Sequence, residues 1–572
     1  RADLAALTPA IIKSLTKWLK SKLIPTKQAC INLLDDLVAV QRGGLASYFD
    51  QIIEPIIDAI KVSAGSASSG LTSTAGNASA TAVTLRIAAL RLAGDIAKYH
   101  SSSVLQPYLS KIVAAVISVA HDRFFKISGE AIQTAEELTK VVTPPRARMT
   151  AQKFKGDLQK IYEVVIDRTT ANDADAEVRQ KAIHALGTLL ARTSGTEGSS
   201  LLPADKRKAA FDCLLERIKN ETTRLFAVRA VDTAAAMSQD TAQFDSQWVR
   251  EVVVELAAQL RKSNRALRGS SVMALKHLVL SPGAKGTLDQ VTVQNVVGAL
   301  IPVITNNDAQ LLGPGLLVLA HLVLEMPAVV MTPQLISGLC HLLHGTVSGS
   351  VLESLLVLVT NAGQAGQGGP LMKALLKDVG VAGDPAVVGK VIGTLLVASG
   401  GTAGVTLDSF VKEIETSAGD QARGSLALSV IGEAGLRLGT KFPILPSLFL
   451  KQFAHDYDKV SVAAAVALGR AGAGNVATYL PAILDAMKQK GGKQYLLLQS
   501  IKEILQQASL NSTDLGQFSA ATWDQILAAT DKDDNKAVAA ECIGRMVIID
   551  PKTYMPKLEV CAPSLDSVFP EY

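Results

Sequence analysis

The stretch "DAEVRQKAIHALGTLLA", residues 175–191, decides the fold class of this 572-residue chain. Its apolar residues recur at the spacing i, i+3, i+4 and i+7, which places them on one face of a helix. The Asp in front of this run can cap the free N–H groups of the helix start. Small residues at fixed places allow a second helix to approach closely. The stretch therefore predicts an amphipathic helix that packs closely on its neighbours.

The same pattern recurs along the chain, in "DQARGSLALSVIGEAGLRLG" (420–439), "DKVSVAAAVALGRAG" (458–472) and "NKAVAAECIGRMVIID" (535–550). Another amphipathic stretch precedes each copy, which gives a unit of helix A, short turn and helix B. About thirteen such pairs and a partial one fit the chain, with a period of about forty residues. This period predicts an all-α solenoid of HEAT or armadillo repeats, and the Asp–x–x–Val–Arg entry into helix B favours HEAT.

The domain organisation follows from this repeat. We expect residues 1–572 to form one continuous HEAT-repeat α-solenoid. The stretch 62–82, rich in Ser, Gly, Ala and Thr, is predicted to be a flexible loop within the second repeat. The stretch "NAGQAGQGGP" (361–370) is predicted to be a Gly-rich connector. The chain begins with Arg rather than Met, so we expect a fragment or a processed product.

Composition disfavours several classes of partner. The chain has 57 basic and 52 acidic residues, and no dense basic run interleaved with aromatic residues, so we expect no nucleic-acid partner. The most apolar run, 309–324, is shorter than the roughly 20 residues that a membrane span needs, so we expect a buried helix and no membrane partner. Five widely spaced cysteines without a C-x-x-C motif favour a reducing compartment.

One glycine motif could indicate either a nucleotide-binding turn of an enzyme or a turn between two repeats of a scaffold. Gly472, Gly474 and Ala477 have the G-x-G-x-x-A spacing of a dinucleotide-binding turn. That fold needs a strand before the turn and an acidic residue about 20 positions after it, and both are missing. We therefore predict a seam between two repeats, where the two glycines adopt left-handed backbone and end one helix. Asn475 is then expected to cap the next helix.

A second motif, "CHLLH", places Cys340, His341 and His344 within five residues. Two histidines at i and i+3 share a helix face, but no third ligand lies nearby, so we predict a partly buried helix A instead of a metal site. The sequence also lacks a G-x-S-x-G elbow and a phosphate-binding P-loop. We expect no cofactor and no enzymatic activity.

Six stretches are more distinctive than a general HEAT pattern. They are "HDRFFKISGEAI" (121–132), "LLERIKNETTRLFAVRAV" (214–231), "LRKSNRALRGSSVMAL" (260–275), "GNVATYLPAIL" (474–484), "GKQYLLLQSIKEILQQAS" (492–509) and "AAECIGRMVIIDPKTYMPKL" (539–558). Together they resemble the cullin-associated, neddylation-dissociated protein family. The resemblance runs in order along most of the chain and is weaker over 285–410, where the sequence is rich in Gly and Val.

This resemblance implies a non-catalytic scaffold. Members of the family wrap around an unneddylated cullin bound to its RING-box subunit, block neddylation and promote exchange of substrate receptors, so we expect a cytoplasmic and nuclear location. The chain matches the central portion of the family, without its first and last repeats. Some fungi encode the family as two polypeptides, so a fungal origin and a separate chain carrying the missing repeats are further expectations.

We expect the contacts with a partner at polar residues that begin helix B in the matching stretches. These residues are Asn220, Arg224, Asn264, Arg265, Lys493, Gln494 and Tyr495. The alternative is that they are solvated turn residues or form hydrogen bonds between repeats. Asp175 and Arg179 are interpreted differently, as a helix cap and as part of a ladder between repeats.

Two other functions stay open at this point. The first is another HEAT scaffold, such as a nuclear transport receptor or a phosphatase regulatory subunit. The second is an enzyme that binds a nucleotide through Gly472 and Gly474.

Overall fold

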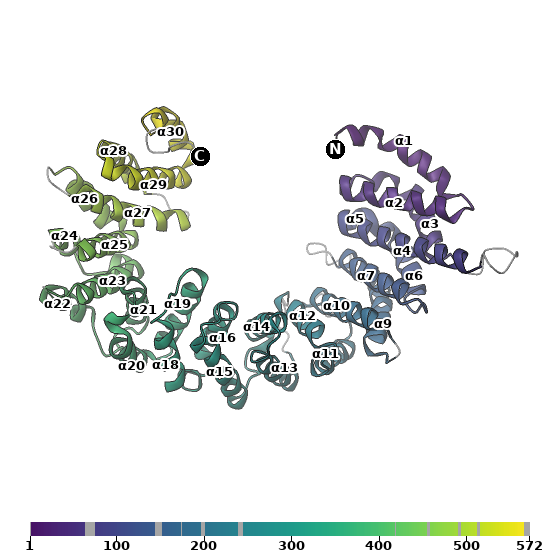
Figure 1. Cartoon of the computed structure of the whole chain (residues 1–572), viewed down its shortest axis with the longest axis horizontal. Helices are drawn as coiled ribbons and strands as arrows, with labels where there is room; N and C mark the ends of the chain where they lie inside the picture. Colours follow the sequence, from purple (N-terminus) through teal and green to yellow (C-terminus); the bar gives the residue numbers. More distant parts are fainter. Residues whose placement is uncertain are drawn as a thin grey trace. The chain divides into compact units, whose positions relative to one another are not determined.

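The computed structural model describes residues 2–62, 75–143, 152–172, 174–195, 201–237, 244–417, 419–454, 458–489, 493–511 and 515–565. Within these ranges the regular structure consists of helices, without a β-strand (Figure 1). Contacts divide the chain into two compact units, Arg1–Val296 (unit 1) and Val297–Tyr572 (unit 2). Each unit is a stack of helix pairs, which confirms the predicted all-α repeat fold.

The helices of unit 1 follow the order A, B through six pairs of the described residues. They are α1 (Ala2–Leu19) and α2 (Ile24–Gln41), α3 (Phe49–Ile60) and α4 (Ala75–Tyr99), α6 (Leu109–Ser118) and α7 (Phe125–Val142), α9 (Lys155–Thr170) and α10 (Ala176–Arg192), α11 (Ala204–Lys219) and α12 (Arg224–Ala236), and α13 (Ser246–Gln259) and α14 (Arg265–Leu280). The one-turn helix α5 (Ser102–Leu105) precedes α6.

Seven more pairs follow in the described residues, and the first of their helices, α15, begins in unit 1. They are α15 (Gln290–Thr305) and α16 (Leu312–Glu325), α18 (Pro333–Leu342) and α19 (Gly349–Gln364), α20 (Gly368–Ala374) and α21 (Pro385–Ala398), α22 (Leu407–Thr416) and α23 (Gln421–Leu438), α24 (Pro446–Lys451) and α25 (Asp458–Gly474), α26 (Val476–Met487) and α27 (Gln494–Leu510), and α28 (Ser519–Ala529) and α29 (Asp533–Ile549). The short α17 (Pro327–Val330) and the last helix, α30 (Pro551–Leu565), stand outside the pairs.

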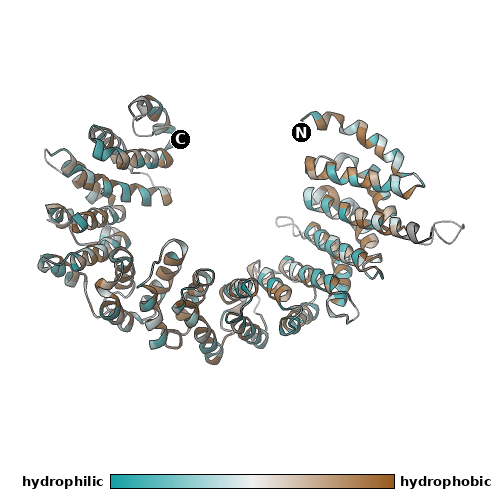
Figure 2. Ribbon diagram, viewed as in Figure 1, coloured by the Kyte–Doolittle hydropathy of each residue, from teal (hydrophilic) through white to brown (hydrophobic). Residues whose placement is uncertain are grey.

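Within each unit the B helices form one layer. In unit 1, α10 packs on α12 and α12 on α14, and in unit 2 the packing runs from α21 through α23, α25 and α27 to α29. Apolar and polar residues alternate along each helix (Figure 2), and the apolar ones form most of the buried core. The last four B helices begin at residues 421, 458, 494 and 533, so their spacing matches the predicted period of about forty residues.

Glycines set the close spacing of the B layer. A Cβ atom on Gly187 would lie 2.8 Å from Cα of Ala230, and one on Gly432 would lie 2.7 Å from Cα of Ala467. Both distances are too short for a real side chain, so each glycine lets the next B helix approach. Gly544 has the same position in the repeat, but no heavy atom of the described chain lies within 4 Å of its Cβ position. The predicted role of small residues is therefore confirmed at Gly187 and Gly432 and does not apply to Gly544.

Both stretches predicted to be irregular contain helix. Residues 63–74 of the predicted loop lie outside the described residues, and α4 begins at Ala75, inside the predicted range. In the predicted connector 361–370, α19 continues to Gln364 and α20 begins at Gly368. A Cβ on Gly363 would lie 2.8 Å from Cβ of Ala398. This glycine serves helix packing, so the turn between the helices is shorter than its glycine content suggested.

The glycine turn at 472–474 corrects one prediction and confirms another. Helix α25 continues through Gly474, and neither Gly472 nor Gly474 has a positive φ, so the predicted left-handed backbone is wrong. A Cβ on Gly474 would lie 2.4 Å from the carbonyl oxygen of Gly435, so the absence of a side chain allows two B helices to meet. Asn475 caps α26 as predicted, because its side chain accepts a hydrogen bond from the backbone N–H of Thr478 at 3.4 Å.

A pair of carboxyl groups joins the B helices of the first two repeats. Burial raises the pKa of Asp35 in α2 to about 7, assisted by a hydrogen bond with Asp95 of α4 and by the charge of Asp95. The positive charge of Arg91 in α4 lowers the pKa of Asp35 in part. Asp35 therefore holds a proton near neutral pH that an unfolded Asp, with a pKa of about 3.9, has already released.

Replacing Asp35 by Asn is expected to stabilise unit 1 at pH 8. Between about pH 4 and pH 7 the folded state binds more protons than the unfolded state, so the contribution of Asp35 to stability falls as pH rises through this window. Asn presents an N–H donor to Asp95 at every pH, so the variant should lose this part of the pH dependence. Thermal unfolding at pH 5, 6.5 and 8 measures the effect, with the exposed Asp36→Asn as the control. A lower midpoint for Asp35→Asn than for the parent at pH 8 would contradict this assignment.

Candidate partner-binding surface

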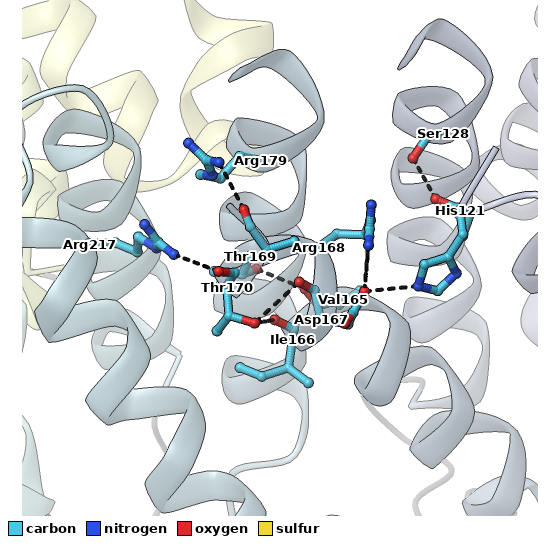
Figure 3. Close-up of polar contacts among 12 residues, drawn as sticks. His121, Ser128, Val165, Ile166, Asp167, Arg168, Thr169, Thr170, Arg179 and Arg217 are labelled. Carbon is cyan, nitrogen blue, oxygen red and sulfur yellow. Dashed lines mark hydrogen bonds and ion pairs between the residues drawn. The ribbon is translucent and has the colours of Figure 1, made fainter. Parts of the chain in front are cut away.

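The short turns between A and B helices carry the residues that the sequence analysis selected, and the turn between α9 and α10 shows how they are built (Figure 3). The carboxylate of Asp175 accepts a hydrogen bond from the N–H of Glu177 at 2.8 Å, which confirms the predicted cap. Arg179 donates to the carbonyl oxygens of Ala171 at 2.8 Å and Ala174 at 3.2 Å. These carbonyls belong to its own turn, so the predicted role of Arg179 in a ladder between repeats is wrong. The guanidinium instead donates to carbonyl oxygens of the turn between α9 and α10, which begins at the C-cap Ala171.

Other side chains link this turn to the neighbouring repeats. Arg217 of α11 donates to the carbonyl oxygen of Thr170 at 3.3 Å, and Nε2 of His121 lies 2.9 Å from Oδ2 of Asp167 (Figure 3). Burial acts to raise the pKa of Asp167, but hydrogen bonds from Arg168 and His121 hold this pKa below its usual value. The ends of three successive A helices are therefore joined by polar contacts.

Asn220 and Arg224 lie in the next turn, between α11 and α12. The side-chain oxygen of Asn220 accepts hydrogen bonds from the N–H and the hydroxyl of Thr222, at 3.0 and 2.8 Å. Arg224 donates to the carbonyl oxygens of Ile218 at 2.8 Å and Lys219 at 3.1 Å. Both side chains thus hold the turn in shape. Asn220 remains exposed, and Arg224 is half-buried.

Asn264 and Arg265 occupy the corresponding turn between α13 and α14. Asn264 is the N-cap of α14, since its side chain accepts from the N–H of Leu267 at 3.0 Å. Arg265 is the first residue of that helix, and every residue from 261 to 266 is exposed. Because α11 packs on α13 and α12 on α14, the turns that carry Asn220 and Asn264 belong to adjacent repeats.

The other three selected residues lie at the start of α27 in unit 2. Lys493 occupies the N-cap position without a capping side chain and is exposed. The side-chain oxygen of Gln494 accepts a hydrogen bond from Asn535 of α29 at 3.4 Å. Tyr495 is 42% exposed, a large fraction for an aromatic residue of the B layer. The selected residues therefore form two groups, one in each unit.

Sequence reasoning missed a groove of about 420 Å³ on the B layer of unit 1. It is lined by Gln133, Glu136, Glu137 and Lys140 of α7, by Glu177, Gln180, Lys181 and His184 of α10, and by Phe226 and Arg229 of α12. At its base, Glu136 accepts from His184 at 2.7 Å and from Thr188 at 2.8 Å. Burial acts to raise the pKa of Glu136, yet these hydrogen bonds and the charge of His184 hold this pKa below its usual value.

Residues 48 positions apart in sequence, such as Glu136 and His184, form this groove, so no local pattern indicates it. A comparison of the residues that share one face on successive B helices could have found it.

The cysteine and histidines of "CHLLH" lie in α18 and just after it. Cys340 is buried, which raises the pKa of its thiol to about 11. Nε2 of His344 lies 3.0 Å from the carbonyl oxygen of Asp378. Among the described residues, no group of three His, Cys, Asp or Glu side chains could hold a metal ion. No helix anywhere in the described residues has both the length and the apolar character that crossing a bilayer requires.

Comparison with known proteins supports the resemblance seen in the sequence. A family model described as "CAND1-like, TPR repeats" matches residues 2–186. The "Cullin-associated NEDD8-dissociated protein 1, C-terminal part" of Emericella nidulans is 41% identical over 562 residues, which cover 98% of this chain and 53% of that protein. The chain is therefore similar to a protein of this name along nearly its whole length.

The chain is also similar, more distantly, to "Cullin-associated NEDD8-dissociated protein 1" of Arabidopsis thaliana, 26% identical over 96% of this chain and 45% of that protein. The protein named "Cullin-associated NEDD8-dissociated protein 2" in Mus musculus is 28% identical over 97% of this chain and 44% of its own length. The chain therefore spans about half the length of the curated relatives that it matches.

Solved structures of other helical-repeat proteins align along the chain at low similarity. Importin beta aligns with 96% of this chain and 81% of its own, at 11% identity and a TM-score of 0.38. The karyopherin Kap121p, bound to the C-terminus of the phosphatase Cdc14p, aligns with 98% of this chain and 62% of its own, at 11% identity and a TM-score of 0.41. These values support no shared function.

Proposed function

We propose that the chain is a non-catalytic scaffold that binds an unneddylated cullin with its RING-box subunit and regulates the assembly of ubiquitin ligases. The observation that carries this proposal is the 41% identity to a cullin-associated NEDD8-dissociated protein over 98% of the chain. The architecture is consistent with it, because stacked helix pairs offer an extended surface for a large protein partner. The proposed location is the cytoplasm and the nucleus, where cullin ligases would be met.

The proposed mechanism is steric. Several contact patches of moderate size, spread over successive repeats, can together give tight binding without a deep pocket. A chain bound in this way covers the neddylation site and loosens the substrate receptor, so that receptors exchange. The A/B turns with Asn220 and Asn264 in unit 1 and Tyr495 in unit 2 are the proposed patches, since these residues are exposed and lie in the turn before a B helix or at its start.

A separate chain carrying further family repeats is a second proposed partner. The Emericella nidulans relative is described as a C-terminal part, and this chain covers 53% of it. A two-chain assembly would combine the repeats that the family distributes between polypeptides in such species.

Binding to a purified cullin–RING-box complex tests the main proposal. We expect the chain to bind the unneddylated complex and to bind the neddylated one at least tenfold more weakly, as measured by biolayer interferometry. Tyr495→Ala should weaken binding about tenfold, because exposed tyrosines are frequent hot spots of interfaces. Leu445→Ala, which removes an exposed apolar side chain ahead of the A helix α24, serves as the matched control. Binding of a transport cargo but not of the cullin complex would instead favour the nuclear transport function.

A further inference from the structure

One contact across the B layer of unit 1 depends on a histidine. Nδ1 of His184 in α10 lies 2.7 Å from Oε2 of Glu136 in α7. The side chain of Glu136 is 7% exposed, whereas that of His184 is 62% exposed. The pair joins the B helices of the third and fourth repeats, which pack directly on each other. A group that titrates near neutral pH therefore faces a buried carboxylate at the seam between two repeats.

Charged side chains from both neighbouring B helices surround His184. The hydrogen bond with Glu136 raises the pKa of His184 above its ordinary value of 6.5, burial acts to lower it, and the charge of Glu136 adds to the rise. Lys140 opposes this rise and Glu137 assists it. The other charged side chains that line the groove are Glu177 and Lys181 of α10 and Arg229 of α12. The A helices α9 and α11 also pack on α10, but their described residues contribute no charged side chain to the groove.

A comparable contact in unit 2 uses a permanent cation. Arg470 of α25 donates to Glu433 of α23 at 2.9 Å, and these two helices are consecutive members of the B layer. A guanidinium stays charged over the whole pH range in which proteins are studied, whereas an imidazole loses its charge near neutral pH. We therefore expect the two seams to respond differently to pH.

We propose that the seam between α7 and α10 is a pH-sensitive joint, which protonated His184 tightens by pairing with Glu136 and which neutral His184 leaves looser. A neutral imidazole can still donate one N–H, but it no longer offsets the charge of the buried carboxylate. The bond from Thr188 to Glu136 at 2.8 Å does not depend on the histidine, so the seam loosens without separating.

The pH window of the joint follows from the two shifts. Because the pKa of His184 is raised, its contribution is complete below about pH 6.5 and is lost as pH rises through the folded-state value. Burial acts to raise the pKa of Glu136, but its hydrogen bonds hold this pKa low, so its contribution is complete above about pH 4.5. The joint is therefore tightest between these two values. It is a property of the fold and goes beyond the function proposed above.

Hydrogen exchange of the full chain, measured by mass spectrometry at pH 6 and pH 9, tests the joint. After correction for the intrinsic effect of pH on exchange, peptides of α10 should be about fivefold less protected at pH 9, as expected when a hydrogen bond to a charged group becomes one to a neutral group. Peptides of α25 should be equally protected at both pH values. His184→Lys, which stays charged at pH 9, should restore the protection of α10, and His184→Gln should remove its pH dependence.

His121→Gln is the matched control. It removes a pair with Asp167 that joins the same two repeats, but both of these side chains are about half exposed, so the pH response of α10 should persist. Asp35 also titrates in this range, but it joins α2 to α4 and is unchanged in every variant. Circular dichroism checks that the variants fold, which is expected because His121 and His184 are exposed.

Three results would overturn the joint. They are equal protection of α10 at pH 6 and pH 9 in the parent chain, an equal response to pH in α25, and a response that persists in His184→Gln. A chain that shows the expected exchange and fails to bind a cullin would refute the proposed function alone.

Discussion

Replacing Glu433 by Gln is expected to lower the free energy of unfolding of unit 2 by about 3–5 kcal/mol, the usual cost of removing one partner from a buried ion pair. Glu433 lies in α23 and its side chain is only 1% exposed. Its two carboxylate oxygens accept from Nε of Arg437 and from Nε of Arg470 in α25, each at 2.9 Å. Arg470 is itself 12% exposed, so water can replace little of the lost interaction.

The charges around this pair increase the expected effect. Burial lowers the pKa of Lys390, and the charge of Arg470 lowers it further, while Glu433 acts in the opposite direction. Without Glu433, the cations Arg470 and Lys390 would repel each other in a poorly solvated site. The remaining acid, Glu503, lies 3.8 Å from Nη1 of Arg470 and compensates only in part.

Urea unfolding followed by circular dichroism measures this change. The control is Glu541→Gln, which breaks ion pairs with Lys502 and Arg545 at a carboxylate that is 41% exposed. An exposed pair contributes at most about 1 kcal/mol, so the control should shift the transition far less. Similar shifts for the two variants would show that Glu433 is better solvated than its burial indicates.

Adding one methyl group at two equivalent glycines is expected to change stability in opposite directions. Gly432→Ala places a Cβ atom 2.7 Å from Cα of Ala467, so α23 and α25 must move apart. Such overpacking costs about 1–3 kcal/mol. Gly544→Ala meets no heavy atom within 4 Å in the described chain and replaces Gly in the middle of α29. It should stabilise the helix by about 0.5–1 kcal/mol, because Ala loses less backbone entropy than Gly.

Thermal unfolding of the two single variants decides between packing and flexibility as the role of Gly432. A stabilised Gly432→Ala variant would show that α23 and α25 can move apart at this position without a loss of stability. Each variant is the other's control, since the two substitutions are chemically identical and differ only in the presence of a following B helix.

The repeat fold was predictable because each helix pair repeats the same pattern of apolar, small and capping residues in the sequence. Asp175 and Asn475 cap helices as predicted, and the spacing of the last four B helices follows the sequence period. Turn predictions based on glycine content failed at Gly363 and Gly474, because the same residue serves flexibility and close packing. Sequence alone does not reveal which use applies, since the deciding atoms belong to another helix.

Only the location of the candidate site along the chain was predictable from the sequence, and the contacts of its side chains were not. Six of the seven selected residues lie at B-helix starts, whereas Asn220 is the C-cap of the A helix α11. The sequence also did not indicate that Arg224 and Arg179 bind carbonyl oxygens of their own turns. The groove beside Glu136 and His184 depends on three helices whose residues are far apart in sequence. Periodicity identifies helices and their faces, whereas a surface shared by several repeats depends on how those faces are aligned.

The glycine contacts of the B layer also carry an evolutionary consequence. Each one joins only two consecutive helices, as Gly432 joins α23 to Ala467 of α25 and Gly187 joins α10 to Ala230 of α12. The nearest atoms are backbone atoms, Cα of Ala467 and Cα of Ala230, so a smaller side chain at the partner would not make room for a larger residue at either glycine. Homologous chains should therefore keep glycine at these two positions, or change it only where the two consecutive B helices lie further apart.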